Sequence, residues 1–165
     1  MPILDEHSLD FISKSAEQTR RIGIRLGGLL RRGDLVCLQG ELGAGKTTLA
    51  QGLAQGWGAL DSVSSPTFVL INVYRRADEA RFFHMDAYRL ASAAEGAELD
   101  LDAMLDAGLL LVEWAERVQQ ILPDERLWIA LEHVGEEHRQ MHFSARGKRY
   151  DALLADLRRS MFGVA

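Results

Sequence analysis

One short segment, Gly40 to Thr47, constrains the fold of this 165-residue chain more than any other part of it. Its sequence, GELGAGKT, matches the pattern G-x-x-x-x-G-K-[ST] in full. The pattern needs a strand before it and a helix after it, because the loop then presents its backbone N–H groups at a helix N-terminus. The apolar run Leu35–Leu38 predicts that strand, and the apolar spacing after Lys46 predicts a helix to about Trp57.

The chemistry of this loop predicts a binding site for nucleotide phosphates. Glycines let backbone N–H groups approach an anion without a clash from Cβ, and the helix N-terminus adds partial positive charge. Lys46 offers a mobile cation for the β- and γ-phosphates, and the Thr47 hydroxyl can ligate Mg²⁺. The predicted nucleotide-binding residues of the loop are Gly40, Glu41, Leu42, Gly43, Ala44, Gly45, Lys46, Thr47 and Thr48.

Strand-like and helix-like segments alternate along the rest of the chain, which predicts an α/β fold. We expect a mostly parallel central sheet with helices on both faces, in a single phosphate-loop (P-loop) NTPase-like domain spanning residues 1–165. The run Leu35–Leu38 is continuously apolar, as in a strand buried on both faces. Further strands are expected at Phe68–Tyr74, Arg81–Met85, Leu109–Val112, Leu127–Leu131 and Gln140–Ala145.

Apolar spacing and capping residues predict the helices. Ser15 with Gln18 three residues later resembles a capping box, so a helix should run from Ser15 to Arg31, with Gly33 as its C-terminal stop. Further helices are expected at Ala93–Leu105, at Ala115–Leu122 and from about Tyr150 to Met161.

Two strands of the predicted sheet end in an acid. Phe82–Met85 is followed by Asp86, and Leu109–Val112 is followed by Glu113. Since the carboxyl ends of strands face the ligand crevice in open α/β sheets, both carboxylates should approach the phosphates. A nucleotidase needs one carboxylate near Mg²⁺ and one group that orients the attacking water. The candidate catalytic residues are therefore Lys46, Asp86 and Glu113, and the candidate metal ligands are Thr47, Asp86 and Glu113.

Three residues near these motifs are further candidates. Pro66 biases Ser65 away from the helical region, so Thr67 could reach Mg²⁺ or the γ-phosphate as a switch residue, although an ordinary turn before a strand has the same sequence. Trp114 directly follows the second acid, and it either packs in the core or contacts the nucleotide. His84 alternates with the first acid along its strand and is expected to be a buried supporting residue rather than a ligand.

Composition excludes several classes of protein. The net charge of −5 argues against a surface that grips nucleic-acid phosphates as a whole. The single cysteine, Cys37, excludes a disulfide framework and a cysteine-based zinc site. No apolar run approaches the roughly 18 residues of a membrane span, and the acidic N-terminal segment is unlike a signal peptide. We expect a cytoplasmic protein with no membrane contact and no DNA partner.

Taken in order, these motifs resemble the TsaE (YjeE) family of small bacterial ATPases. The resemblance covers residues 15–134 and begins with Ser15, Glu17 and Thr19 of the helix before the first strand. It continues with the phosphate loop, with SPTF at 65–68, HMDAYR at 84–89 and EW at 113–114. Many families share the phosphate loop, whereas the ordered combination of SPTF, HxDxYR and EW is far more specific. Glu41 departs from the family, which usually has Asp at that position.

The resemblance implies an accessory role in the threonylcarbamoyladenosine (t6A) modification of tRNA. It implies that ATP and Mg²⁺ are the cofactors and that Arg139 lies beside the nucleotide. It also implies that Asp86 and Glu113 both act at the nucleotide, with Glu113 on the metal side. It also implies the TsaB–TsaD pair as partners, in which TsaD carries out the transfer to adenosine, so that this chain would act on tRNA only indirectly. No second cation is clearly placed beside Lys46, so the isolated chain is expected to be a weak, partner-dependent ATPase.

Other interpretations remain open at this point. A small-molecule P-loop kinase would have a similar size, but the sequence has no arginine-rich insertion at a lid position, and Arg89 is a lone candidate. A guanine-specific GTPase typically reads its base with Asn-Lys-x-Asp, and the only asparagine here, Asn72, precedes a valine. Asp86 and Glu113 argue against a module that binds ATP without turnover.

Overall fold

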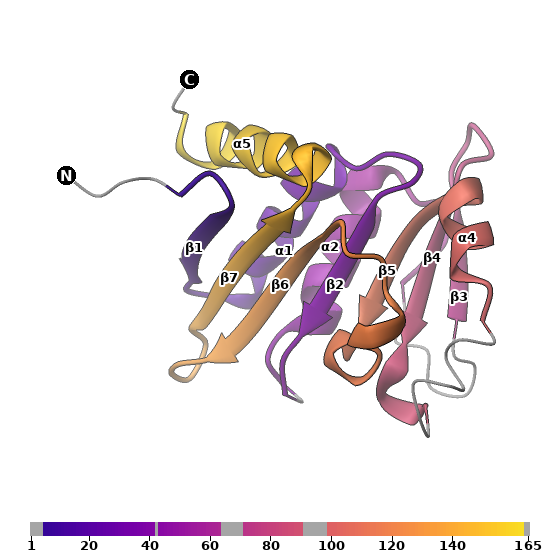
Figure 1. Ribbon diagram of the computed structural model, residues 1–165. Coiled ribbons are helices and arrows are strands. Elements are labelled where there is room, and N and C mark those ends of the chain that lie inside the picture. Colours follow the sequence, from indigo (N-terminus) through magenta and orange to yellow (C-terminus); the bar gives the residue numbers. More distant parts are fainter. Residues whose placement is uncertain (1–4, 42, 64–70, 91–98, 164–165) are drawn as a thin grey trace.

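Seven strands form one sheet in the computed structural model of the chain, which describes residues 5–41, 43–63, 71–90 and 99–163 (Figure 1). Four neighbouring strands in the centre run parallel, and the strands toward both edges run antiparallel to their neighbours. The strands lie in the order β1 (Ser8–Ser13), β7 (Arg139–Arg146), β6 (Arg126–His133), β2 (Leu35–Gln39), β5 (Gly108–Glu113), β4 (Arg81–Asp86) and β3 (Ile71–Arg75).

The expectation of an α/β fold is confirmed, but the expectation of a mostly parallel sheet is wrong. Three of the six pairings between described strands are antiparallel, namely β1 with β7, β7 with β6, and β4 with β3. Residues 134–138 join β6 to β7, and residues 76–80 join β3 to β4. Connections this short cannot make the crossover that a parallel pair needs, so each pair turns back on itself as a hairpin.

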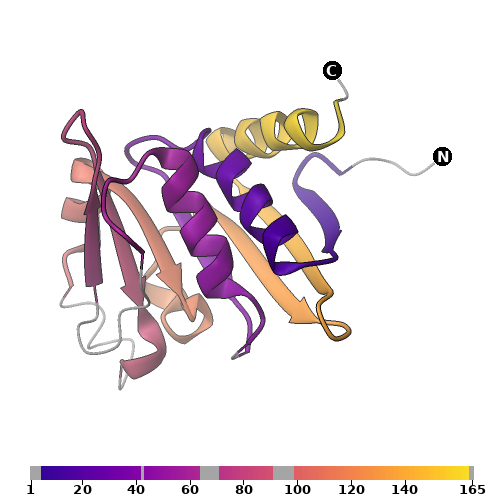
Figure 2. The ribbon, with the colours of Figure 1, turned by 180° about the vertical axis from the view of Figure 1, so that it is seen from behind.

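Helices cover both faces of the central strands, as the continuous apolar runs predict. Alternate residues of β2 belong to opposite layers of the core: Val36 and Leu38 to one, Leu35 and Cys37 to the other. The first layer lies under α1 (Ala16–Gly27), α2 (Lys46–Trp57) and α5 (Lys148–Phe162). Figure 2 shows α1 and α2 on the near side of the sheet. The second layer lies under α4 (Leu101–Ala107) and the 3₁₀ turns η2 (Ala115–Arg117) and η3 (Gln119–Ile121).

Glycines hold α2 in close contact with α1. A Cβ built on Gly23 would lie 2.6 Å from the carbonyl oxygen of Leu49, and one built on Gly52 would lie 2.2 Å from that of Arg20. Neither distance is compatible with a side chain, so the two helices pack backbone against backbone at these positions. This contact fixes the helix that follows the phosphate loop.

Several predicted helix boundaries need correction. Ser15 caps α1 as expected, since its hydroxyl accepts a hydrogen bond from the N–H of Gln18, but the helix ends at Gly27 rather than at Arg31. Gly33 instead makes the turn before β2, with φ of +92°. The predicted helix Ala115–Leu122 is two separate 3₁₀ turns. The predicted helix Ala93–Leu105 falls partly outside the described residues, within which α4 begins at Leu101.

The other half of the sheet is covered on one face only. No described helix covers the face of β6, β7 and β1 that is turned toward the viewer in Figure 1. Nothing in the sequence interpretation predicts β1, whose residues alternate between buried and solvent-exposed positions. Ile12 on this edge strand is 53% exposed. No helix among the described residues is long and apolar enough to cross a membrane.

Candidate nucleotide site

The phosphate loop leaves the sheet at the C-terminal end of β2 and leads directly into α2 (Figure 1). Gly43 and Gly45 have φ of +81° and +103°, in the left-handed region that favours glycine. A Cβ on Gly40 would lie 2.7 Å from the carbonyl oxygen of Leu131, whereas a Cβ on Gly43 would point into open space. The glycines therefore serve both the curvature of the loop and its close approach to β6.

The Lys46 side chain lies inside this loop. The residue is 6% exposed, and its ammonium donates hydrogen bonds to the backbone carbonyl oxygens of Gly40 and Glu41. Burial lowers the pKa of Lys46, and four nearby carboxylates partly offset that effect: Glu113, Glu116, Asp86 and Glu41. The loop thus holds its cation ready for an anion that would replace the carbonyl oxygens as its partner.

The two predicted acids lie next to each other. Asp86 and Glu113 are register partners at the ends of β4 and β5, and β5 pairs in turn with β2, from which the loop begins. Asp86 is half-buried, and its Oδ1 accepts a hydrogen bond of 2.9 Å from the N–H of Tyr88. Burial raises the pKa of Asp86, and the neighbouring charge of Glu113 acts in the same direction. The parallel centre of the sheet thus brings both carboxylates to the loop.

A buried hydrogen-bonded chain supports Glu113 from behind. The Nε2 of His84 lies 2.6 Å from Oε2 of Glu113, and the Nδ1 of His84 lies 2.9 Å from the hydroxyl of Tyr74. His84 is fully buried, which agrees with its expected role as a supporting residue rather than a ligand. Tyr74 was not foreseen, because its partnership depends on the β3–β4 hairpin and no spacing along the chain signals it.

Trp114 lies against the cation of the loop. The Nζ of Lys46 is 3.8 Å from the centroid of the Trp114 ring, a cation–π contact. On the other side, the rings of Trp114 and Tyr88 have centroids 4.8 Å apart, and the guanidinium of Arg117 lies 4.8 Å from the Tyr88 ring. Trp114 has a left-handed backbone, with φ of +57°, which ends β5 and starts η2. Trp114 packs partly on the core, which is one of its two expected roles, and it also contacts the phosphate-loop lysine. Its contact with the nucleotide stays a prediction.

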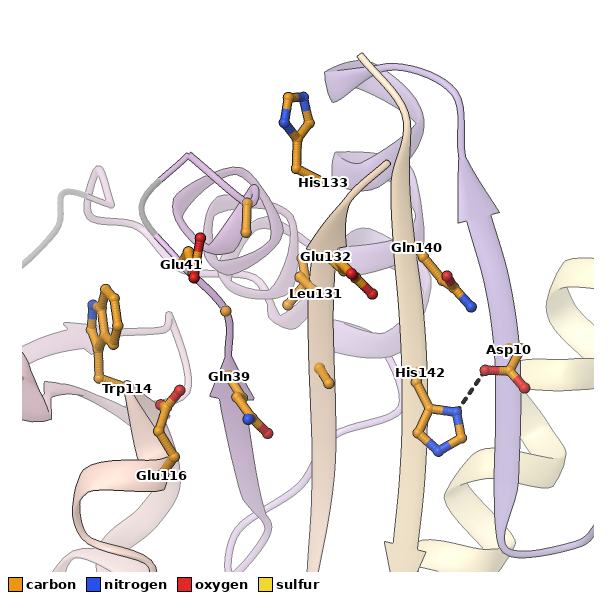
Figure 3. Close-up of a pocket in the computed structure, with 13 residues that line it drawn as sticks. Asp10, Gln39, Glu41, Trp114, Glu116, Leu131, Glu132, His133, Gln140 and His142 are labelled. Carbon is orange, nitrogen blue, oxygen red and sulfur yellow. Dashed lines mark hydrogen bonds and ion pairs between the residues drawn. The ribbon is translucent and has the colours of Figure 1, made fainter. Parts of the chain in front are cut away.

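A pocket of about 800 Å³ opens beside the loop on the open face of the sheet (Figure 3). It extends from Trp114 and Glu41 across β6 to the ion pair between His142 and Asp10, whose Nδ1 and Oδ1 are 2.6 Å apart. Four carboxylates line it, and its described lining contains no lysine or arginine. These carboxylates belong to Asp10, Glu41, Glu116 and Glu132. The sequence interpretation missed Glu116, one oxygen of which is buried without a hydrogen-bond partner.

A second, smaller pocket of about 310 Å³ borders the N-terminal ends of α1 and α2. Gly45 and Thr48 of the loop line it together with Thr19 and Arg139. A Cβ on Gly45 would lie 3.8 Å from Cγ of Arg139, so this arginine packs directly against the loop. Arg139 donates a hydrogen bond of 3.1 Å to the carbonyl oxygen of His138. Arg139 therefore lies next to the phosphate loop, and its place beside the nucleotide stays a prediction.

Some sequence predictions cannot be placed in this geometry. Leu42 and the segment 64–70, which contains Thr67, lie outside the described residues. Arg89, the lone candidate for a kinase lid, lies in the 3₁₀ turn η1 (Ala87–Arg89), and the position of its side chain is not described. Thr47, the predicted Mg²⁺ ligand, is exposed at the first turn of α2, directly after Lys46.

Comparison with known proteins decides the family. A family model described as "Threonylcarbamoyl adenosine biosynthesis protein TsaE" matches residues 13–141 of the chain. The chain belongs to the TsaE family. The matched segment contains the phosphate loop, both strand-end acids and Arg139, so the resemblance inferred from the motifs is confirmed.

Individual TsaE relatives agree in sequence and in fold. The chain is 38% identical over 143 residues to a Bacillus subtilis protein named tRNA threonylcarbamoyladenosine biosynthesis protein TsaE, with 87% of this chain and 89% of the relative covered. It is 42% identical to the protein of the same name from Streptomyces coelicolor, over 79% of this chain and 93% of the relative. The crystal structure of Bacillus subtilis YdiB superposes with a TM-score of 0.78 at 34% identity, covering 93% of this chain and 96% of YdiB.

Proposed function

We propose that this chain is a Mg²⁺-dependent ATPase that serves the t6A modification of tRNA. The observation that carries the proposal is the position of Lys46 inside a complete phosphate loop, beside the paired strand ends that bear Asp86 and Glu113. Membership in a family whose relatives are named for t6A biosynthesis supports the biological role. Since bacterial tRNA is modified in the cytoplasm, the proposal also places the protein there.

The phosphate loop is the proposed binding site for the phosphates of ATP. The N–H groups between Gly40 and Thr48 would surround them, and Lys46 would exchange its two carbonyl partners for phosphate oxygens. Arg139 and Thr48, in the smaller pocket on the far side of the loop, lie where they could contact the rest of the nucleotide. Trp114 would keep its contact with the Lys46 side chain. Thr67, outside the described residues, remains a candidate for contact with the γ-phosphate from its sequence alone.

The donor set suits Mg²⁺ bound together with a nucleotide rather than a metal held by protein alone. Within the described residues, no three His, Cys, Asp or Glu side chains gather into a metal site. Mg²⁺ usually takes one or two protein oxygens, keeps several waters and completes its shell with phosphate oxygens. Thr47 and Glu113 would supply the protein oxygens, and Mg²⁺ there would neutralise charge on the phosphates.

The two acids have environments that suit different tasks. Glu113 is buried and held by His84, so its position is fixed, as a group that binds metal directly or through water requires. Asp86 is half-buried and its pKa is raised, so it holds a proton more readily than an ordinary aspartate. It is therefore suited to orient the attacking water and to receive a proton from it. We therefore assign the metal side to Glu113 and the water side to Asp86.

The charge around the loop supports the proposal that turnover depends on a partner. Phosphoryl transfer gains much of its rate from cations that neutralise the transition state. The large pocket beside the loop contributes four carboxylates and, within the described lining, no lysine or arginine. A partner that brings a cation into this pocket would be attracted by those carboxylates and could complete the site. TsaB and TsaD are the proposed partners.

The test is ATP turnover by the isolated protein and by the protein with TsaB and TsaD from the same organism. We expect slow turnover alone and a rise of about 10³-fold with both partners, as when a missing cation is supplied in trans. A Lys46→Ala variant with the same partners controls for contaminating ATPases. Fast turnover that the partners leave unchanged, or transfer of the γ-phosphate to a free small-molecule acceptor, would instead identify a hydrolase or a kinase that works independently.

A further inference from the structure

A buried arginine without a counter-ion lies on the open face of the sheet, at the start of β6. Arg126 is 4% exposed. Its Nη1 donates one hydrogen bond of 3.2 Å to the carbonyl oxygen of Pro123, while its buried Nε has no partner. Within the described residues no carboxylate forms an ion pair with Arg126. A buried charge destabilises the folded protein unless an opposite charge or a full set of hydrogen bonds compensates it, so the buried guanidinium of Arg126 indicates a missing anionic partner.

A second arginine lies directly across from it. Arg126 of β6 and Arg146 of β7 are register partners in an antiparallel pair, so both side chains project from the same face. Arg146 is exposed and likewise has no ion pair within the described part of the chain. Like charges directly opposite each other destabilise a sheet, and the pair becomes favourable only when an anion lies between the two guanidiniums.

These two arginines line a pocket of about 220 Å³ that is separate from the phosphate loop. Its other residues are polar or aromatic: Gln39, Gln119, Trp128 and Ser144. Trp128 and Ser144 form the next pair of facing residues in the same two strands. The guanidinium of Arg126 lies 5.0 Å from the Trp128 ring, which holds it in place beneath the pocket. No acid lines the pocket among the described residues.

We propose that Arg126 and Arg146, with Ser144 and Gln119, form a binding site for a phosphate group. Two guanidiniums, a hydroxyl and an amide offer more hydrogen-bond donors than the two oxygens of a carboxylate can use, and they suit a tetrahedral dianion. A tetrahedral phosphate group is present as a dianion in inorganic phosphate and as a singly charged diester in the backbone of RNA. The site does not depend on the proposed ATPase activity, because none of these four residues lines either pocket beside the phosphate loop.

The phosphate pocket is connected to the nucleotide loop through one side chain. The indole N–H of Trp128 donates a hydrogen bond of 2.8 Å to Oε1 of Gln39, the residue directly before Gly40. Gln39 lines both this pocket and the large pocket beside the loop, and Figure 3 shows it projecting from the end of β2. The indole N–H of Trp128 therefore reports on the phosphate pocket at atomic resolution.

The experiment follows the Trp128 indole N–H resonance by NMR while inorganic phosphate is added, with ADP and Mg²⁺ saturating the phosphate loop throughout. We expect a saturable shift below about 10 mM phosphate, and no such shift with chloride at equal ionic strength. Arg146→Met should abolish the shift, while Arg75→Met, an exposed arginine on the opposite edge strand β3, should leave it unchanged. A shift that persists in Arg146→Met, or no saturable shift in the unmodified protein, would overturn the proposal.

Thermal unfolding provides the second readout. Phosphate should raise the Tm of the unmodified protein and of Lys46→Ala but not that of Arg146→Met, because a ligand stabilises only a fold that binds it. Arg126→Met should unfold no earlier than the unmodified protein in chloride, since it removes a buried charge without a partner. If Arg126→Met is instead strongly destabilised in chloride and phosphate alike, the arginine is structural and the proposal fails.

Two further ligands identify the source of the phosphate. A short uridine oligonucleotide without terminal phosphates tests the RNA backbone. Binding of the oligonucleotide in addition to inorganic phosphate supports a site that also accepts the RNA backbone, and binding of inorganic phosphate alone supports a site for a free phosphate group. Acetate tests the carboxylate alternative, as in an acidic segment of a protein partner. Binding of acetate without binding of phosphate would contradict the assignment.

Discussion

The two halves of the sheet differ in how many of their faces are covered, and the difference decides where each half can carry polar groups. The strands β2, β5 and β4 are buried on both faces along most of their length, so apart from His84 and from Arg81 at the start of β4 their polar side chains gather at the C-terminal ends, beside the phosphate loop. The strands β6, β7 and β1 have one open face, and polar residues occur along their whole length. In the covered half, made of β2, β5 and β4, a site is therefore confined to strand ends. In the open half, made of β6, β7 and β1, a pocket can lie along the strands, and the pocket lined by Arg126 and Arg146 is an example.

The largest expected effect separates nucleotide handling from folding in the covered half. Lys46→Ala should reduce partner-stimulated ATP turnover by about 10²–10³-fold, since one preorganised cation at the phosphates is removed. Alanine is a good helix former, so the fold should survive at this first position of α2. A steady-state assay measures turnover, calorimetric titration with Mg-ATP measures nucleotide binding, and a circular dichroism melt measures whether the variant is folded. Unchanged turnover in a folded variant would break the link between the loop and the activity.

The covered and open halves should also differ in how strongly they contribute to stability. Leu111→Ala in β5 removes a fully buried side chain and should lower the free energy of unfolding by about 2–5 kcal/mol. Ile12→Thr on β1 changes an exposed side chain and should alter it by less than about 0.5 kcal/mol. Urea unfolding of the two variants gives the comparison directly. Equal losses would show that the open face is buried in solution.

The strand-end acids should separate by their dependence on Mg²⁺. Glu113→Gln should raise the Mg²⁺ concentration needed for turnover, and Asp86→Asn should lower turnover at saturating Mg²⁺, by about 10–10²-fold in each case. Asparagine can keep the hydrogen bond from the N–H of Tyr88, so the turn after β4 should persist. Steady-state turnover across a Mg²⁺ series distinguishes the two effects. Reversed dependences would exchange the roles of the acids, and two fully active variants would remove both from the site.

The smallest expected effect is a loss of stability at alkaline pH. Burial raises the pKa of the Cys37 thiol and of the Tyr150 hydroxyl to about 12. The folded protein therefore keeps protons that the unfolded chain releases from about pH 9 upward, so stability is retained below that pH and falls as the pH rises toward 12. At pH 10 the loss should be about 1–2 kcal/mol. Urea unfolding at pH 8 and pH 10 measures it, and an unchanged free energy would contradict the burial of the two groups.

The sequence predicts the covered half well because its constraints are local. A complete phosphate loop must follow a strand and precede a helix, and an apolar run that ends in an acid places that acid at the edge where the loop begins. Asp86, Glu113 and Lys46 are neighbours for this reason. The interpretation also placed His84 as a buried support, since alternation along a strand is regular.

The sequence predicts strands at β6 and β7, but not the contacts of the open half and of the β3–β4 hairpin, because these contacts depend on how strands pair rather than on a pattern along one segment. Short hairpin turns, rather than composition, make β6–β7 and β3–β4 antiparallel, and the polar alternation of β1 resembles that of a surface loop. Arg126 and Arg146 are 20 positions apart, and only the register of β6 with β7 brings them together. The partnership of Tyr74 with His84 depends on a hairpin in the same manner.

The most direct test of the central claim is formation of t6A on a tRNA transcript with TsaB, TsaD and a threonylcarbamoyl donor, measured with ATP and either the unmodified chain or Lys46→Ala. The account predicts that repeated rounds of modification require the unmodified chain and hydrolysable ATP, and that Lys46→Ala, folded and at equal concentration, supports none. Equal t6A yields with both proteins, or with no protein of this family added, would contradict the account.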